Sequence, residues 1–162
     1  MTTIRKTFLS TALLGIAMAS FGATPAAVPA PAAGKVCKLE ITANDLIQYD
    51  KKELHVAGDC ATVELTLKHA GKLPIQSMGH NWVLTKTADV SAVASAGMAA
   101  GLKNDHVPAN DQRVIAHTKL IGGGETTRVT FPTSKLQKGG DYTYFCSFPG
   151  HNAIMRGKLI FG

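Results

Sequence analysis

Ten residues near the C-terminus, from Cys146 to Met155, place three soft metal ligands in one short segment. The segment reads Cys-Ser-Phe-Pro-Gly-His-Asn-Ala-Ile-Met, so His151 lies five positions after the cysteine and the methionine four positions after His151. A thiolate, an imidazole and a thioether together suit copper better than magnesium or calcium. Pro149 and Gly150 favour a tight loop. The rest of the chain must therefore supply a scaffold that holds this loop and any further ligand.

The N-terminal residues 1–23 have the pattern of a secretory signal peptide. A basic start precedes a mostly apolar run over residues 8–21, and small residues follow. We expect cleavage between Ala19 and Ala23. The apolar run is too short to span a bilayer comfortably, so the mature protein is expected to have no membrane anchor.

The remaining chain divides into a tail and one domain. Residues 24–34 are rich in proline and alanine and are predicted to form a semi-extended tail. Residues 35–162 are long enough for one domain with its own core. The formal net charge is +6 without a run of lysine or arginine or a ladder of aromatic residues, so we expect no nucleic acid partner.

Three cysteines follow the signal, and export implies an oxidising compartment in which a pair forms a disulfide. Cys37 and Cys60 lie early in the chain, whereas Cys146 lies in the ligand-rich loop. The simplest assignment bridges Cys37 to Cys60 and leaves Cys146 unpaired. The unpaired cysteine needs a reason to stay reduced, and a bound metal provides one.

Alternation of apolar and polar residues predicts an all-β domain. The pattern is clearest over 61–68, where Val63, Leu65 and Leu67 share one face. Helical spacing of apolar residues predicts one inserted helix over 87–102. These elements indicate a Greek-key β-sandwich or barrel of about eight strands. The expected strands are 37–42, 49–56, 61–68, 81–85, 113–120, 126–131, 141–146 and 155–161.

A further histidine ligand must come from outside the loop, because electron-transfer copper sites use two histidines, a cysteine and a weak axial methionine. His80 is the best candidate, since it lies where a loop meets a predicted strand. Gly79 would let the backbone approach the metal, so that its carbonyl could be a second weak axial ligand. The other histidines are interpreted as structural or surface residues: His55, His69, His106 and His117.

Three segments resemble the azurins, a family of bacterial blue-copper proteins with the cupredoxin fold. They are Met-Gly-His-Asn-Trp-Val-Leu at 78–84, Arg-Val-Ile-Ala-His-Thr-Lys-Leu-Ile-Gly at 113–122, and the segment 145–155. The four residues between Cys146 and His151 favour azurin, because plastocyanin, pseudoazurin and amicyanin have shorter spacings. The resemblance covers essentially all of the chain from Cys37 onward.

The resemblance assigns a role to several residues. His80, Cys146 and His151 would be the strong ligands of one copper ion, with Met155 and the Gly79 carbonyl as weak axial ligands. Cys37 and Cys60 match the azurin disulfide, and His69 matches a buried histidine that does not bind the metal. Asn81 would brace the ligand loop, and the backbone amides of Asn81 and Phe148 would donate to the sulfur. An apolar docking patch would comprise Leu73, Met78, Met98, Phe148, Pro149 and Ala153.

The function that this resemblance implies is one-electron transfer by a monomeric periplasmic carrier that is not an enzyme. Its expected partners are small redox proteins such as c-type cytochromes, or periplasmic reductases and dehydrogenases. The copper would cycle between Cu(II) and Cu(I). Three other functions remain open on the sequence alone. They are copper storage or delivery, a structural zinc site, and an enzyme with Cys146 as nucleophile and His151 as base.

Overall fold

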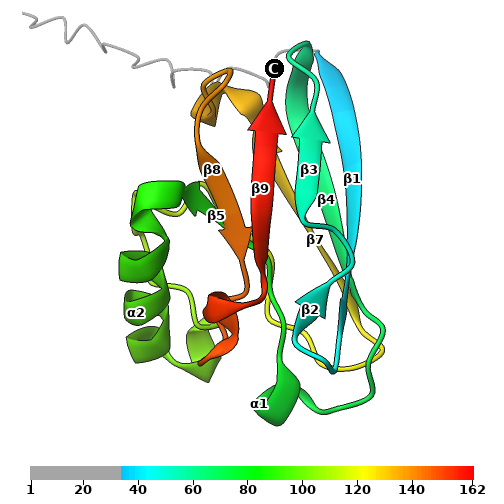
Figure 1. The fold of residues 1–162 in the computed structure, drawn as a ribbon, viewed down its shortest axis with the longest axis vertical. Helices are drawn as coiled ribbons and strands as arrows, with labels where there is room; N and C mark the ends of the chain where they lie inside the picture. The colour runs from blue at the N-terminus through cyan, green and yellow to red at the C-terminus, as the bar shows by residue number, and fades with distance from the viewer. Residues whose placement is uncertain (1–33) are drawn as a thin grey trace, which may run out of the picture. The chain divides into compact units, whose positions relative to one another are not determined.

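The computed structural model describes residues 34–162, which form two sheets packed face to face (Figure 1). The strand order is β2-β1-β4-β7 in the first sheet and β3-β9-β8-β5-β6 in the second. This architecture confirms the predicted all-β class. The strands are β1 Lys35–Asn44, β2 Gln48–Tyr49, β3 Glu53–Val56, β4 Cys60–His69, β5 Val83–Lys86, β6 Ala116–His117, β7 Thr126–Pro132, β8 Tyr142–Phe145 and β9 Arg156–Phe161. The predicted signal peptide and the predicted tail up to residue 33 lie outside the described residues.

The first sheet is built around β4, in which every second side chain from Val63 to His69 is buried. Strand β1 runs parallel to β4 with Leu39 opposite Leu65, and β7 runs antiparallel with Val129 opposite Leu65. The Cys37–Cys60 disulfide joins β1 to the start of β4. It closes a loop with a sequence separation of 23, which contributes about 3 kcal/mol in the chain-entropy model.

The core lies between the inner faces of the two sheets. Trp82 and Tyr144 are both fully buried, and their rings stack with centroids 5.9 Å apart. Around them the first sheet contributes mainly aliphatic side chains. The core residues that the two sheets contribute include Ile41, Val63, Leu65, Leu67, Leu84, Phe131, Leu159 and Phe161.

Two predicted strands differ from the observed ones. The run 49–56 divides into β2 and β3, which belong to different sheets, because the chain crosses between the sheets at Asp50, Lys51 and Lys52. The Asp50 carboxylate accepts a hydrogen bond from the Thr42 amide at 2.8 Å and so fixes the crossing. The run 113–120 pairs over only two residues, because it then leaves the sheet edge.

The helical residues also differ from the prediction. Helix α2 spans Val90–Ala100 with a 3-10 turn at each end, and it stops at Gly101, whose φ of 73° favours glycine. Its apolar side packs on the outer face of the second sheet, where Val93 meets Val83 and Phe145. A short second helix, α1 (Ile75–Met78), forms after Pro74 where a loop was expected. Within residues 34–162, none of the helices has the length and apolarity needed to cross a bilayer.

Candidate metal centre

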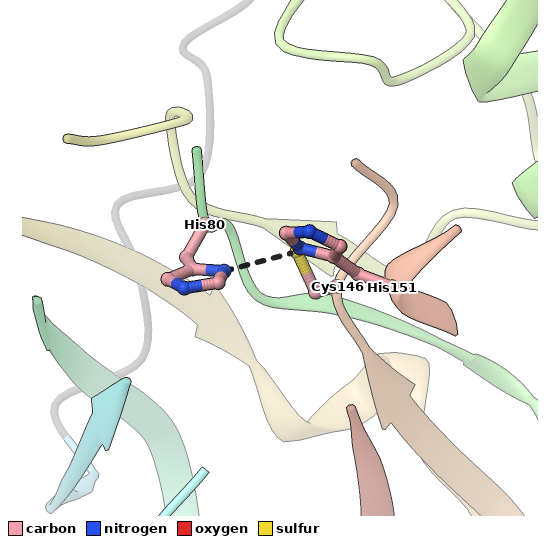
Figure 2. A group of neighbouring side chains, drawn as sticks. All are labelled: His80, Cys146 and His151. Atoms are coloured by element: carbon pink, nitrogen blue, oxygen red, sulfur yellow. Dashed lines mark hydrogen bonds between the residues drawn. The ribbon is translucent and has the colours of Figure 1, made fainter. Parts of the chain in front are cut away.

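Two segments that are distant in the sequence, one holding His80 and one holding Cys146 and His151, come together in the fold. His80 follows α1 and forms a two-way backbone bridge with Ile121, with both N–H···O distances 2.9 Å. Cys146 directly follows β8, and His151 begins a 3-10 turn that leads into β9. Figure 2 shows the side chains of His80, Cys146 and His151 converging on a common point. The fold therefore unites the three residues that the sequence suggested as strong ligands.

The donor atoms of these three residues are close enough to share one ion. The Cys146 Sγ lies 3.8 Å from the His80 Nδ1 and 3.6 Å from the His151 Nδ1. The three atoms all lie within 4.8 Å of one another. His80 and Cys146 are fully buried, and His151 is only 4% exposed. A metal held here would be shielded from bulk water.

The hydrogen bonding of His80 leaves the correct nitrogen free. Its Nε2 lies 2.9 Å from the Asn44 carbonyl oxygen, which can only accept, so Nε2 carries the proton and Nδ1 presents its lone pair. Burial lowers the pKa of His80 to about 4, and burial likewise lowers that of His151 to about 4. Both rings are therefore neutral at neutral pH, the form that binds a metal.

The Cys146 thiol lies in an environment that opposes its ionisation unless a cation is present. Burial raises the pKa of this thiol to about 12, while the backbone N–H groups of Asn81 and Phe148 act in the opposite direction. The Gly79 carbonyl oxygen lies 3.8 Å from Sγ. A bound cation would supply the missing stabilisation of the thiolate.

Backbone hydrogen bonds tie the ligand loop into a closed turn. The Cys146 amide donates to the Met155 carbonyl at 3.0 Å, and the Met155 amide donates to the His151 carbonyl at 2.8 Å. Gly150 adopts a φ of 83°, which lets the chain turn back before His151. Met155 is fully buried directly before β9. The positions of Cys146 and His151 are therefore set by these backbone hydrogen bonds and by the strands on either side of the loop, not by a flexible connection.

Asn81 links this loop to a second one. Its side chain donates to the Asp105 carbonyl at 2.7 Å and to the Ser147 hydroxyl at 2.8 Å, and its Oδ1 accepts from the Ser147 amide at 2.9 Å. Asn81 is fully buried. The side chain thus fixes the residue after Cys146 relative to the residue after His80.

Gly79 is required at its position by close approach. A Cβ there would lie 2.6 Å from the Ile75 carbonyl oxygen and 2.7 Å from the Leu120 Cδ2. Its φ of −65° is open to any residue, so space and not backbone conformation excludes a side chain. The carbonyl of residue 79 can face the sulfur only because the chain packs this tightly.

His69 lies beside the site without a free nitrogen. Its ring centroid is 4.4 Å from that of His80, its Nδ1 accepts from the Gly71 amide at 3.0 Å, and its Nε2 lies 3.0 Å from the Met78 carbonyl oxygen. His106 is buried but its ring packs on Phe148, with ring centroids 5.4 Å apart. His55 and His117 are exposed.

Two contributions to the site were not recognised from the sequence. The Asn44 carbonyl orients His80, and a backbone carbonyl leaves no sequence signal. The buried Tyr49 hydroxyl donates to the Asn81 carbonyl. A buried tyrosine needs a hydrogen-bond partner for its hydroxyl. A tyrosine at a core-facing position of a strand was therefore the sequence signal that could have indicated this contact.

The residues proposed for a docking patch differ in exposure. Met98 is 55% exposed and Leu73 is 42% exposed. Pro149 and Ala153 are exposed, whereas Met78 and Phe148 are half-buried. The Phe148 ring lies against His151, with ring centroids 4.6 Å apart, so it connects the exposed residues of the loop to the candidate ligand.

Comparison with known proteins identifies relatives over this whole region. Residues 35–162 match the model of copper-binding proteins of the plastocyanin/azurin family. Azurin of Bordetella pertussis (strain Tohama I) is 54% identical over 134 residues, which cover 83% of this chain and 89% of that protein. Azurin-1 of Alcaligenes xylosoxydans xylosoxydans is 58% identical over 123 residues, which cover 76% and 95%. A solved structure of azurin Az-iso2 from Methylomonas sp. strain J is 46% identical with a TM-score of 0.76, covering 78% of this chain and 98% of that chain.

Proposed function

Because this chain belongs to the plastocyanin/azurin family of copper-binding proteins, we propose that it is a one-electron carrier with a single type 1 copper site. His80, Cys146 and His151 would hold the ion. Met155 and the Gly79 carbonyl would be its weaker ligands. The observation that supports this function best is the buried convergence of two Nδ1 atoms on one sulfur.

The donor set fits copper on its own chemistry. Two neutral imidazoles and one thiolate are the trigonal ligands of electron-transfer copper sites, and a methionine is the usual axial partner. Bound there, copper would supply a one-electron change between Cu(II) and Cu(I). Structural zinc sites usually have four strong ligands, whereas only three strong donors converge among the described residues.

The surrounding residues contribute rigidity. His80 is held by the Ile121 bridge and the Asn44 carbonyl, while Cys146 and His151 are held by the backbone turn that ends at Met155. Ligands that are fixed from outside change little when the charge of the site changes. Little rearrangement favours rapid electron exchange, which favours an electron carrier over a copper storage protein.

The exposed side of the site would receive the redox partner. Within the patch proposed to comprise Leu73, Met78, Met98, Phe148, Pro149 and Ala153, the Phe148 ring lies against His151, so a partner docked there would lie close to this imidazole. Electron-transfer contacts are small and transient, which suits a modest apolar patch. We propose small redox proteins such as c-type cytochromes, or periplasmic reductases and dehydrogenases, as the partners of a monomeric protein.

A role as a cysteine enzyme has less support. The Cys146 thiol is fully buried, and its raised pKa of about 12 opposes a nucleophilic role at neutral pH. We therefore propose that the protein has no enzymatic activity of its own. We further propose the periplasm as its location. The signal-like segment at residues 1–23 and the Cys37–Cys60 disulfide support an oxidising compartment.

The copper-loaded protein is expected to be intensely blue when oxidised and to bleach on reduction, because Cys146 would supply a thiolate to Cu(II). Visible spectroscopy during repeated oxidation and reduction, with copper content measured before and after, checks this. A colourless Cu(II) complex would contradict the type 1 site. Loss of copper in each cycle would favour storage or delivery instead of electron transfer.

Substitution of Met98 by lysine should slow electron exchange between two copies of the protein about tenfold or more, with little change in the visible spectrum. When two patches face each other, the substitution places like charges together and leaves them partly desolvated. NMR line broadening in mixtures of oxidised and reduced protein measures the exchange rate. Ala92→Lys adds the same charge at another exposed position of α2 and should have a much smaller effect. Equal rates for Met98→Lys and the native protein would reject this patch as the docking face.

A further inference from the structure

A groove lies on the outer face of the second sheet, beside the part that α2 covers. Helix α2 packs over β5 and β8, whereas strand β9 lies beyond it (Figure 1). Leu159 points into the core, so Arg156 and Lys158 point outward in the alternation of β9. The groove has a volume of about 410 Å³. Its lining includes Lys52, Thr87, Thr143, Arg156, Gly157 and Lys158.

One end of the groove is a closed polar network. The Lys158 ammonium donates to the Asp141 carboxylate and, at 3.1 Å, to the Thr87 hydroxyl. The Thr87 hydroxyl also donates to Asp141 at 2.8 Å and lies 2.8 Å from the Thr143 hydroxyl. These bonds hold Lys158 in place, and Asp141 neutralises its charge.

The other two cations of the groove are not neutralised. Within residues 34–162, neither the Lys52 ammonium nor the Arg156 guanidinium forms an ion pair. The nearest acid of β3 is Glu53, opposite Lys158 in register, and its carboxylate lies 3.5 Å from the His55 Nε2. Two uncompensated positive charges therefore border the groove.

We propose that this groove binds a small dianionic oxyanion group, such as a phosphate or a pair of carboxylates. Lys52 and Arg156 match its two charges, and a guanidinium can bind two oxyanion oxygens at once. The volume admits a ligand larger than inorganic phosphate, so both a phosphate and a short dicarboxylate fit.

The groove lies next to the candidate metal centre along the chain. Arg156 directly follows Met155, and it pairs in register with Phe145, which directly precedes Cys146. A dianion held by Arg156 would stabilise the oxidised site, which carries one more positive charge, relative to the reduced site. Binding should therefore lower the reduction potential. This second step rests on the proposed function, whereas binding itself does not.

Titration of the reduced protein at constant ionic strength tests the binding site. Inorganic phosphate and succinate, added separately at pH 8, are expected to shift the amide NMR signals of Thr143 and Gly157 in a saturable way. The ligand that binds more tightly distinguishes a phosphate site from a dicarboxylate site, and chloride should cause no saturable shift. Lys52→Gln combined with Arg156→Gln should weaken binding at least tenfold. Lys72→Gln combined with Lys103→Gln removes the same charge elsewhere and should leave binding unchanged. No saturable shift, or equal weakening by both pairs, would overturn the proposal.

The reduction potential is then measured with and without a saturating amount of the tighter ligand. The native protein should show a lower potential, and the Lys52→Gln/Arg156→Gln protein should show no change. Saturable NMR binding without a change in potential would refute the coupling but keep the binding site. A protein that binds the anion but shows no reversible copper redox chemistry would refute the proposed function alone.

Discussion

Replacement of Cys146 by serine is expected to abolish the blue colour and reversible electron transfer while the fold survives. A serine hydroxyl is a hard, weakly acidic donor, so the site would lose the thiolate that suits copper in both oxidation states. The hydroxyl fits the same buried position and can hydrogen-bond to an imidazole nitrogen, since both Nδ1 atoms lie within 4 Å of the native sulfur. Visible absorption and voltammetry check the loss, and far-UV circular dichroism checks the fold.

The other two cysteines provide a matched control. Serine at both Cys37 and Cys60 removes the disulfide that joins β1 to β4, so the free energy of unfolding should fall by about 3 kcal/mol. The colour should remain, because this bridge does not contribute a donor atom to the site. A blue Cys146→Ser protein, or a colourless disulfide variant that is still folded, would contradict the ligand assignment.

The sequence predicted the elements whose pattern is decided locally. Strand β4 was expected at 61–68 and spans Cys60–His69, because one of its faces meets the core and the other does not. Helix α2 was expected within 87–102 and ends at Gly101, where glycine is favoured. In both segments, whether a side chain is buried or exposed follows from its position in the repeating pattern of that segment.

The sequence could not show which sheet a strand joins. Residues 49–56 were predicted as one strand, yet β2 pairs with β1 and β3 pairs with β9. Residues 113–120 were also predicted as one strand, but only Ala116 and His117 pair in register with β5. Pairing depends on residues far away in the sequence, so alternation alone overestimates the length of such strands.

In the candidate site too, the part that lies within one short segment could be predicted more directly than the part that depends on distant residues. The Cys146–Met155 loop was evident because its donors lie within ten residues of one another. His80 and His69 are both buried histidines whose rings lie against each other, and their hydrogen bonds distinguish the candidate ligand from its neighbour. His69 uses both nitrogens on backbone groups, whereas His80 keeps Nδ1 free. The family resemblance had indicated this choice, and the hydrogen bonds provide its physical basis.

Truncation of Asn81 to alanine is expected to lower the free energy of unfolding by about 2–6 kcal/mol and to speed the loss of copper. The change leaves the Ser147 amide and the Asp105 carbonyl without their hydrogen-bond partner in a buried site, at a cost of about 1–3 kcal/mol for each group. It also removes the side chain through which the residue after His80 is hydrogen-bonded to Ser147, the residue after Cys146. Chemical denaturation of copper-free and copper-loaded protein, together with transfer of copper to a chelator, measures both effects.

Substitution of Asn104 by alanine is the control that distinguishes the loss of the Asn81 hydrogen bonds from a general effect of removing an asparagine. Its side chain donates to the Ala100 carbonyl at 2.8 Å in an exposed position, so Asn104→Ala should cost no more than about 0.5 kcal/mol. If Asn81 fixes the distance between the two ligand segments, its removal should destabilise the copper-loaded protein more than the copper-free protein. Equal destabilisation of both forms would mean that Asn81 only satisfies buried backbone groups. A loss below about 1 kcal/mol in both would mean that water replaces its hydrogen bonds.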